Sequence, residues 1–120
     1  MLIAVGALLA AAGVALGAFG AHALKSRLST DMLAVWNTGV QYHLWHALGM
    51  ILVGLSAAGM AESAWSRTAG ALLLAGIVLF SASLYALALG APKWLGAVTP
   101  LGGAAFLLGW LAFAVAALRG

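Results

Sequence analysis

The stretch QYHLWHALGM, residues 41–50, carries the sequence from a polar segment into a long apolar one. Residues three or four apart lie above each other on a helix, so Tyr42, His46 and Gly49 share one stripe. His43 lies three residues before His46, and both imidazoles can therefore face the same neighbour. A buried polar group without a hydrogen-bond partner costs about 2–7 kcal/mol. We therefore expect the imidazoles to have partners, whose identity is the functional question.

The composition around this stretch is that of a membrane protein. Hydrophobic residues make up 66% of the 120 residues and charged residues only 6%, whereas charged residues are about a quarter of a soluble domain. A membrane span needs about 20 apolar residues, and the intervals between the few charged residues provide room for four. The charged residues are Lys25, Arg27, Asp31, Glu62, Arg67, Lys93 and Arg119.

We expect an all-α fold, with four transmembrane helices in an antiparallel up-and-down bundle that forms a single transmembrane domain over residues 1–120. The expected spans cover residues 2–20, 44–60, 68–89 and 100–118. The second helix should begin with an amphipathic, interfacial segment, because Met32, Val35, Trp36 and Val40 recur at helical spacing with polar residues between them. Ser29 or Thr30 could cap that start.

Small residues recur every three or four positions in the first and last spans, which predicts close helix packing. The glycines expected in such contacts are Gly6, Gly13, Gly17, Gly102 and Gly109. The same Gly/Ala faces could support a homo-oligomer, and membrane lipids are the other expected partners.

The distribution of basic residues predicts the orientation in a bacterial inner membrane. Lys25 and Arg27 follow the first span closely, and no basic residue precedes it. Basic residues favour cytoplasmic loops, so the first and third loops should be cytoplasmic and both termini should lie outside.

Several function classes receive no support. Five basic residues scattered over separate segments form no patch for nucleic acid. The absence of cysteine excludes disulfides and thiolate chemistry. The two carboxylates, Asp31 and Glu62, belong to different loops, so no Ser–His–acid triad is expected. We predict no catalytic residue and no cofactor.

Antiparallel threading brings four helix ends to one membrane face, where most of the polar side chains collect. The candidate ligand-binding cluster there consists of His22, Tyr42, His46, Ser81, Ser83 and Tyr85. In a structural interpretation, Tyr85 and Ser81 hydrogen-bond His46 and tie helices together. In a functional interpretation, the cluster lines a pocket for a lipid headgroup, a quinone-like molecule or a small metabolite.

Two other functions stay open. The imidazoles of His43 and His46 and the thioether of Met50 would suit copper or haem iron, although no nearby carboxylate is available to orient them. A minimal transporter would need an ionisable group within a span, and His46 is the candidate. Loss of transport in His46→Ala would identify that role.

Four segments in order resemble the small bacterial inner-membrane family that includes YgdD, a domain-of-unknown-function family with a eukaryotic transmembrane relative. They are residues 16–24, 42–48, 80–85 and 99–103, followed by Gly109-Trp110. The resemblance covers nearly the whole chain and implies a multi-pass membrane protein of this size, but no reaction. His22 and His46 fit the family pattern, whereas the family often has a different polar residue at the position of His43.

Overall fold

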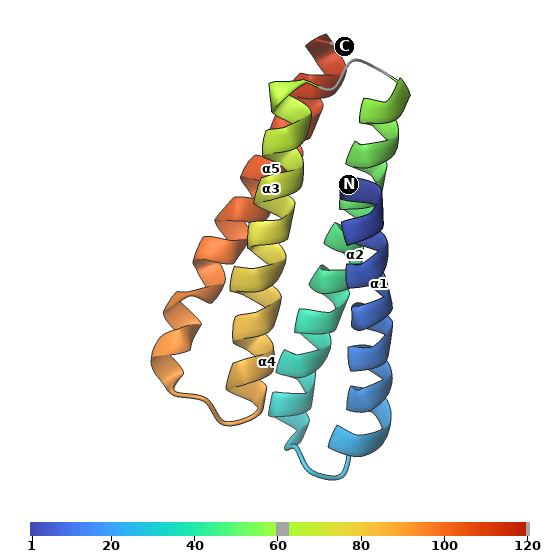
Figure 1. The fold of residues 1–120 in the computed structure, drawn as a ribbon. Helices are drawn as coiled ribbons and strands as arrows, with labels where there is room; N and C mark the ends of the chain where they lie inside the picture. The colour runs from blue at the N-terminus through green and yellow to red at the C-terminus, as the bar shows by residue number, and fades with distance from the viewer. Residues whose placement is uncertain (60–62, 120) are drawn as a thin grey trace.

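The computed structural model describes residues 1–59 and 63–119, and the described residues form helices and turns without a β-strand. Four helical rods follow one another along the chain (Figure 1). Their elements are α1 (Leu2–Phe19) with the π-helical turn η1 (Gly20–Leu24), α2 (Thr30–Gly59), α3 (Ala64–Gly76) continued by the π-helical turn η2 (Ile77–Ser81) and α4 (Ala82–Ala88), and finally the short 3₁₀ helix η3 (Lys93–Ala97) followed by α5 (Thr99–Arg119).

The second rod is one long helix. The expected amphipathic segment and the expected span over residues 44–60 are both parts of α2, which runs unbroken for 30 residues. Ser29 caps its start, since its hydroxyl accepts a hydrogen bond from the Met32 backbone at 3.2 Å. Met60, the expected last residue of this span, and Glu62 lie outside the described residues.

Three of the four rods have the length and apolar composition needed to cross a membrane. They are Leu2–Leu24, Ala64–Ala88 and Lys93–Arg119, found among the described residues. The third rod begins at Ala64, four residues before the expected span, because the Ser63 hydroxyl caps it by accepting from the Ser66 backbone. The second rod is less apolar because Asn37, Gln41 and the two histidines interrupt it.

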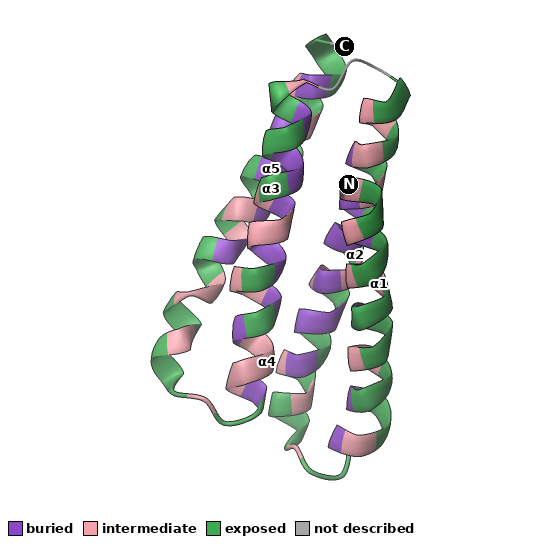
Figure 2. Ribbon diagram, in the orientation of Figure 1, coloured by how far each residue is buried: buried purple, intermediate pink, exposed green. Residues whose placement is uncertain are grey.

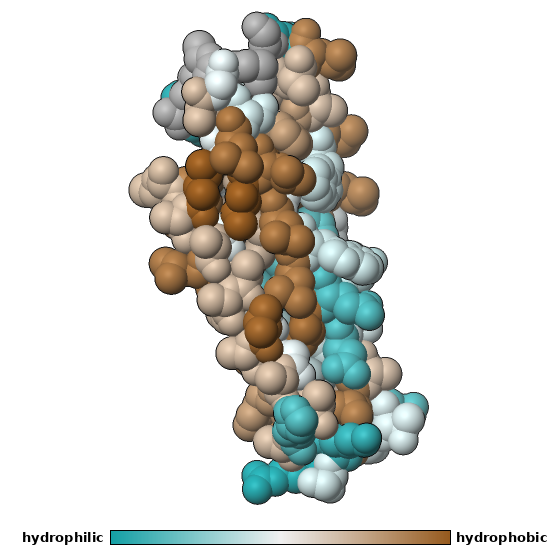
Figure 3. Space-filling view, turned by 90° about the vertical axis from the view of Figure 1, so that its right-hand side faces the viewer, coloured by the Kyte–Doolittle hydropathy of each residue, from teal (hydrophilic) through white to brown (hydrophobic). Residues whose placement is uncertain are grey.

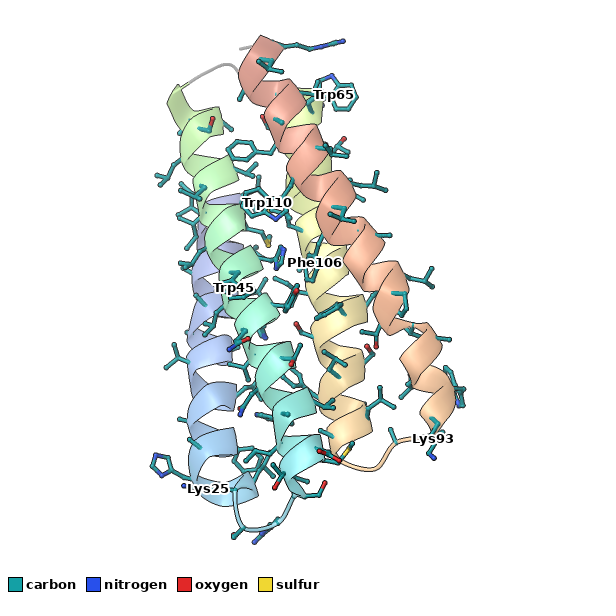
Figure 4. The ribbon with its side chains drawn as sticks, turned by 180° about the vertical axis from the view of Figure 1, so that it is seen from behind. Lys25, Trp45, Trp65, Lys93, Phe106 and Trp110 are labelled. Carbon is teal, nitrogen blue, oxygen red and sulfur yellow. The ribbon has the colours of Figure 1, made fainter. Side chains whose placement is uncertain are left out.

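Consecutive rods run in opposite directions and form two pairs (Figure 1). The helix α1 packs on α2, and α5 packs mainly on α3 and η2, while α2 joins the pairs through its contacts with α3, η2 and α4. The Cα atoms extend over 48 × 26 × 17 Å, so the arrangement is flatter than a square bundle. Lys25 and Lys93 lie at one end and Trp65 at the other (Figure 4).

Buried residues lie where the two pairs meet, on the facing sides of α2 and α3 (Figure 2). Met50, Val53 and Leu73 are almost completely buried there. Large apolar side chains such as Leu8 and Leu107 are instead exposed. Figure 3 shows an apolar surface with hydrophilic residues gathered toward one end and along one edge. The exposed polar residues of α2 are Thr30, Asp31, Asn37, Thr38 and Gln41.

The glycines singled out in the sequence face other helices of the same chain. A Cβ atom on Gly13 would lie 2.7 Å from Leu44 Cδ2, and one on Gly6 would lie 2.9 Å from the Ala47 carbonyl oxygen. Gly17 faces Val40 in the same way, while Gly102 faces Phe80 and Gly109 faces Leu73. These small residues therefore allow neighbouring helices of one molecule to approach closely, and self-association through the same faces stays a prediction.

Candidate functional site

Two hydrogen bonds join α2 to the rod formed by α3, η2 and α4. The ring nitrogen Nδ1 of His43 lies 3.0 Å from the Tyr85 hydroxyl, and the Ser81 hydroxyl donates to the Gly39 carbonyl at 2.8 Å. Gly39 makes the approach possible, because a Cβ atom there would lie 2.8 Å from Tyr85 Cε1. Ser81 is also the last residue of η2, and π-helical turns of this kind occur frequently at functional sites.

A third connection joins α4 to the start of α5. The Ser83 hydroxyl donates to the Phe80 carbonyl at 2.8 Å and lies 2.6 Å from the Thr99 hydroxyl. The residues of these three connections form what we call the polar layer, which consists of Gly39, His43, Ser81, Ser83, Tyr85 and Thr99. Each polar side chain of the layer thus has a hydrogen-bond partner within the protein. The layer involves three of the four rods, namely α2, the rod of α3, η2 and α4, and the rod of α5.

The structural interpretation was wrong about His46, because Tyr85 bonds His43 and Ser81 bonds the Gly39 carbonyl. His46 instead donates from Nδ1 to the Tyr42 carbonyl of its own helix at 2.6 Å. Successive helical residues are rotated by about 100°, so residues three apart differ in direction by about 60°. That difference turns His43 toward α4 and His46 toward α5.

Aromatic side chains surround His46. Its ring stacks on Phe106, with centroids 3.5 Å apart and planes inclined by 13°, and the Trp110 centroid lies 6.1 Å away. Phe106 and Trp110 reach from α5 toward α2 (Figure 4). Tyr42 also stacks near His46 and packs its ring against Phe80 at 4.5 Å. We call Tyr42, His46, Phe80, Phe106 and Trp110 the aromatic cluster.

The six candidate ligand-binding residues therefore occupy three environments. Ser81, Ser83 and Tyr85 belong to the polar layer, and Tyr42 and His46 belong to the aromatic cluster. His22 lies apart from both, exposed on η1 near the charged end of the molecule.

The three residues considered for a metal also have separate surroundings. The Nδ1 atoms of His43 and His46 each have a different partner on a different segment. Met50 is 1% exposed and belongs to the apolar core around Leu73. Within residues 1–59 and 63–119, no group of three or more His, Cys, Asp or Glu residues is placed to hold a metal. The metal site stays a hypothesis.

Trp36 and His43 connect helices, a role that no pattern in the sequence predicted. Trp36 is 2% exposed, and its Nε1–H donates to the Leu16 carbonyl of α1 at 3.0 Å. Gly20, inside the family segment 16–24, could have indicated this close contact, because only a residue without a side chain leaves room for Trp36. A Cβ atom on Gly20 would lie 2.6 Å from Trp36 Cδ1. His43 is 4% exposed, and its Nε2 has no hydrogen-bond partner among the described residues, although the Leu9 backbone approaches the ring.

A pocket of about 480 Å³ lies away from the polar layer, near the opposite end of the molecule. It is lined by the start of α1, the last turns of α2 and the first turns of α3. Its walls are largely apolar, with Arg67 as the charged residue among them.

Known proteins match this chain over most of its length. The family model described as "Protein of unknown function (DUF423)" matches residues 16–103, a range that includes the whole polar layer. The UPF0382 membrane protein YwdK of Bacillus subtilis is 49% identical over 117 residues, covering 98% of this chain and 95% of the relative. The UPF0382 membrane protein SERP0230 of Staphylococcus epidermidis is 44% identical, with coverages of 98% and 94%.

A UPF0382 membrane protein of Haemophilus influenzae is 40% identical over 106 residues, covering 88% of this chain and 84% of the relative. No solved structure matches the chain. The relatives are thus membrane proteins by name, in agreement with the apolar helices found here.

Proposed function

The chain belongs to the DUF423 family, and we propose that it works in the bilayer as a structural four-span unit whose polar layer locks two helical pairs together. The proposal rests on one observation. The His43–Tyr85 and Ser81–Gly39 hydrogen bonds both cross from α2 to the neighbouring rod. Polar side chains on membrane helices contribute about 0.6–2 kcal/mol when they bond across helices.

The engagement of these polar groups with one another favours a structural role over a ligand-binding role for the layer. A ligand site would require polar atoms that converge on open space. The pocket of about 480 Å³ at Arg67 lies elsewhere, and its walls carry none of the six candidate residues. The layer therefore acts on the stability and rigidity of the bundle.

We further propose that the four rods thread the inner (plasma) membrane of a bacterium in antiparallel order. The loops that carry Lys25, Arg27 and Lys93 then face the cytoplasm, and the start of α1 and the end of α5 face outward. The proposal is supported by Lys25 and Lys93, which lie at the same end of the molecule (Figure 4), and by the preference of basic loops for the cytoplasm. The other end carries Arg67 and Arg119. The same proposal includes the YgdD-like inner-membrane proteins among the relatives of this chain.

A purification in detergent tests the structural role. The double variant Ser81→Ala/Tyr85→Phe should unfold at lower temperature than the wild type, while its absorption spectrum and metal content remain those of the wild type. If the wild type instead carries a Soret band or stoichiometric metal that the variant loses, the layer serves a redox centre and the structural proposal is wrong.

A further inference from the structure

The lining of the pocket near the start of α3 follows the helices around it. On α2 its lining reaches from Met50 to Ala58, and on α3 from Arg67 to Leu74. At a rise of about 1.5 Å per residue, these intervals extend about 12 Å and about 10 Å along the helix axes. Because the two helices are antiparallel, Arg67 and Ala57 lie toward one end of the pocket, and Met50 and Leu74 lie toward the other.

Small residues create the space between these helices. Gly54, Ala57 and Ala58 line the pocket from α2, and Gly70 and Ala71 line it from α3. The first turn of α1 closes another side, where a Cβ atom on Gly54 would lie 3.0 Å from the Ile3 backbone nitrogen. The result is a largely apolar channel whose walls on α2 and α3 run along these helices, which is the direction of lipid chains in a bilayer.

Positive charge lies at one end of this channel. Arg67 lines the pocket and is exposed. The start of α1 lies at the same pocket without a side-chain cap or an acidic residue in its first turn, and helix starts carry partial positive charge. Trp65 at this end of the molecule is 40% exposed, and Arg119 lies over its ring at 5.6 Å. Exposed tryptophans of membrane proteins collect at the level of the lipid headgroups.

We propose that this pocket binds one acyl chain of an anionic phospholipid taken from the surrounding bilayer, with the lipid phosphate beside Arg67. The apolar walls accept the chain, and the guanidinium provides the hydrogen-bond donors that suit a phosphate. The site lies away from the polar layer, so this inference does not rest on the proposed structural function.

Native mass spectrometry of the full chain in detergent tests the site with three added lipids. They are dioleoyl phosphatidylglycerol, dioleoyl phosphatidylcholine and dioleoyl glycerol, at equal concentration. The wild type should retain one phosphatidylglycerol in preference to the other two. Arg67→Gln should weaken that binding about fivefold and remove the preference, whereas the control Arg119→Gln, at the same end, should not.

A second pair of variants tests the channel itself. Ala57→Leu fills the pocket and should reduce the retention of all three lipids, whereas Ala104→Leu, on the exposed side of α5, should leave retention unchanged. Because Arg67 is exposed, Arg67→Gln keeps the test valid even if Ala57→Leu fails to fold. The proposal is wrong if Arg67→Gln binds phosphatidylglycerol as the wild type does, if Arg119→Gln weakens binding equally, or if folded Ala57→Leu retains lipid normally.

Discussion

The Tyr85 hydroxyl lies 3.0 Å from Nδ1 of His43, so that a single hydrogen bond connects α4 to the middle of α2. His43 is 4% exposed, and its other ring nitrogen lacks a partner within the described residues. Tyr85 is therefore the side chain that satisfies this imidazole. Its ring also packs on Trp36, with centroids 4.7 Å apart, and Trp36 in turn bonds α1. Tyr85 thus connects three rods.

Tyr85→Phe should destabilise the protein because it keeps the ring and removes the hydroxyl that pairs with His43. A buried polar group that loses its partner costs about 1–3 kcal/mol. Reversible unfolding in mixed detergent micelles measures the loss.

Tyr42→Phe is the matched control for this variant. Tyr42 contributes its ring and its backbone carbonyl to the aromatic cluster, and the substitution keeps both. Equal stability of the two variants would show that the His43–Tyr85 bond has no net effect on stability.

His46 should stabilise the protein through the stacking of its ring more than through its charge or its hydrogen bond. The ring stacks on Phe106 at 3.5 Å, while its Nδ1–H bonds a carbonyl of the same helix. We expect His46→Phe to stay within about 1 kcal/mol of the wild type, because a second aromatic ring keeps the stacking. His46→Ala should lose about 2–4 kcal/mol, because it leaves a cavity between α2 and α5.

The same unfolding measurement distinguishes these two variants. If His46→Phe is as unstable as His46→Ala, the imidazole nitrogens contribute more than the stacking, and a polar role for His46 regains support. If both variants are as stable as the wild type, the contact with Phe106 contributes little.

The sequence predicted the helical class and the membrane environment well, because both depend on composition. Long uncharged intervals allow few structures other than membrane helices, and three rods have the expected length and apolarity. The approximate position of the polar residues along the helices also follows from the order of the helices, because it brings Tyr85 and Ser81 next to α2.

The pairing of these polar residues could not be predicted, because it depends on the rotation of each helix about its axis. A rotation of about 60° separates His43 from His46, and no periodicity in one helix shows which neighbour it faces. The family resemblance also favoured His22 and His46 over His43. The π-helical turn ending at Ser81 changes the direction of side chains further.

The pocket at Arg67 was invisible in the sequence for a different reason. It depends on how far α1 extends beside α2 and α3, and therefore on the tertiary packing of Leu2 and Ile3 against Gly70 and Gly54. The expected third span began at residue 68, just after Arg67, whereas Arg67 belongs to the first turns of α3.

Cysteine labelling should find the first and third connections on the same side of the membrane. The chain contains no cysteine, so single substitutions provide clean probes. In sealed inverted membrane vesicles, Ser26→Cys and Ala91→Cys should react with an impermeant maleimide, because both should face the cytoplasm. Ala64→Cys, at the start of α3, should react only after the vesicles are opened.

Opposite accessibility of Ser26→Cys and Ala91→Cys would overturn the antiparallel threading. If both were protected while Ala64→Cys reacted, the threading would hold but the proposed orientation would be reversed.

Two adjacent glycines at the start of α5 provide the sharpest test of helix packing. A Cβ atom on Gly102 would lie 2.7 Å from the Phe80 Cα atom and closer still to the Phe80 nitrogen. Because the obstacle is backbone, α5 and η2 would have to move apart, and Gly102→Ala should cost about 1–3 kcal/mol. At Gly103 the nearest such atom is Phe80 Cδ2 at 4.0 Å, so Gly103→Ala should be neutral or stabilising by up to about 1 kcal/mol, as expected from helix propensity. The difference between the two unfolding free energies isolates the helix contact from the propensity, because the substitution is identical. A difference near zero would mean that α5 does not pack on η2 through Gly102 in the membrane.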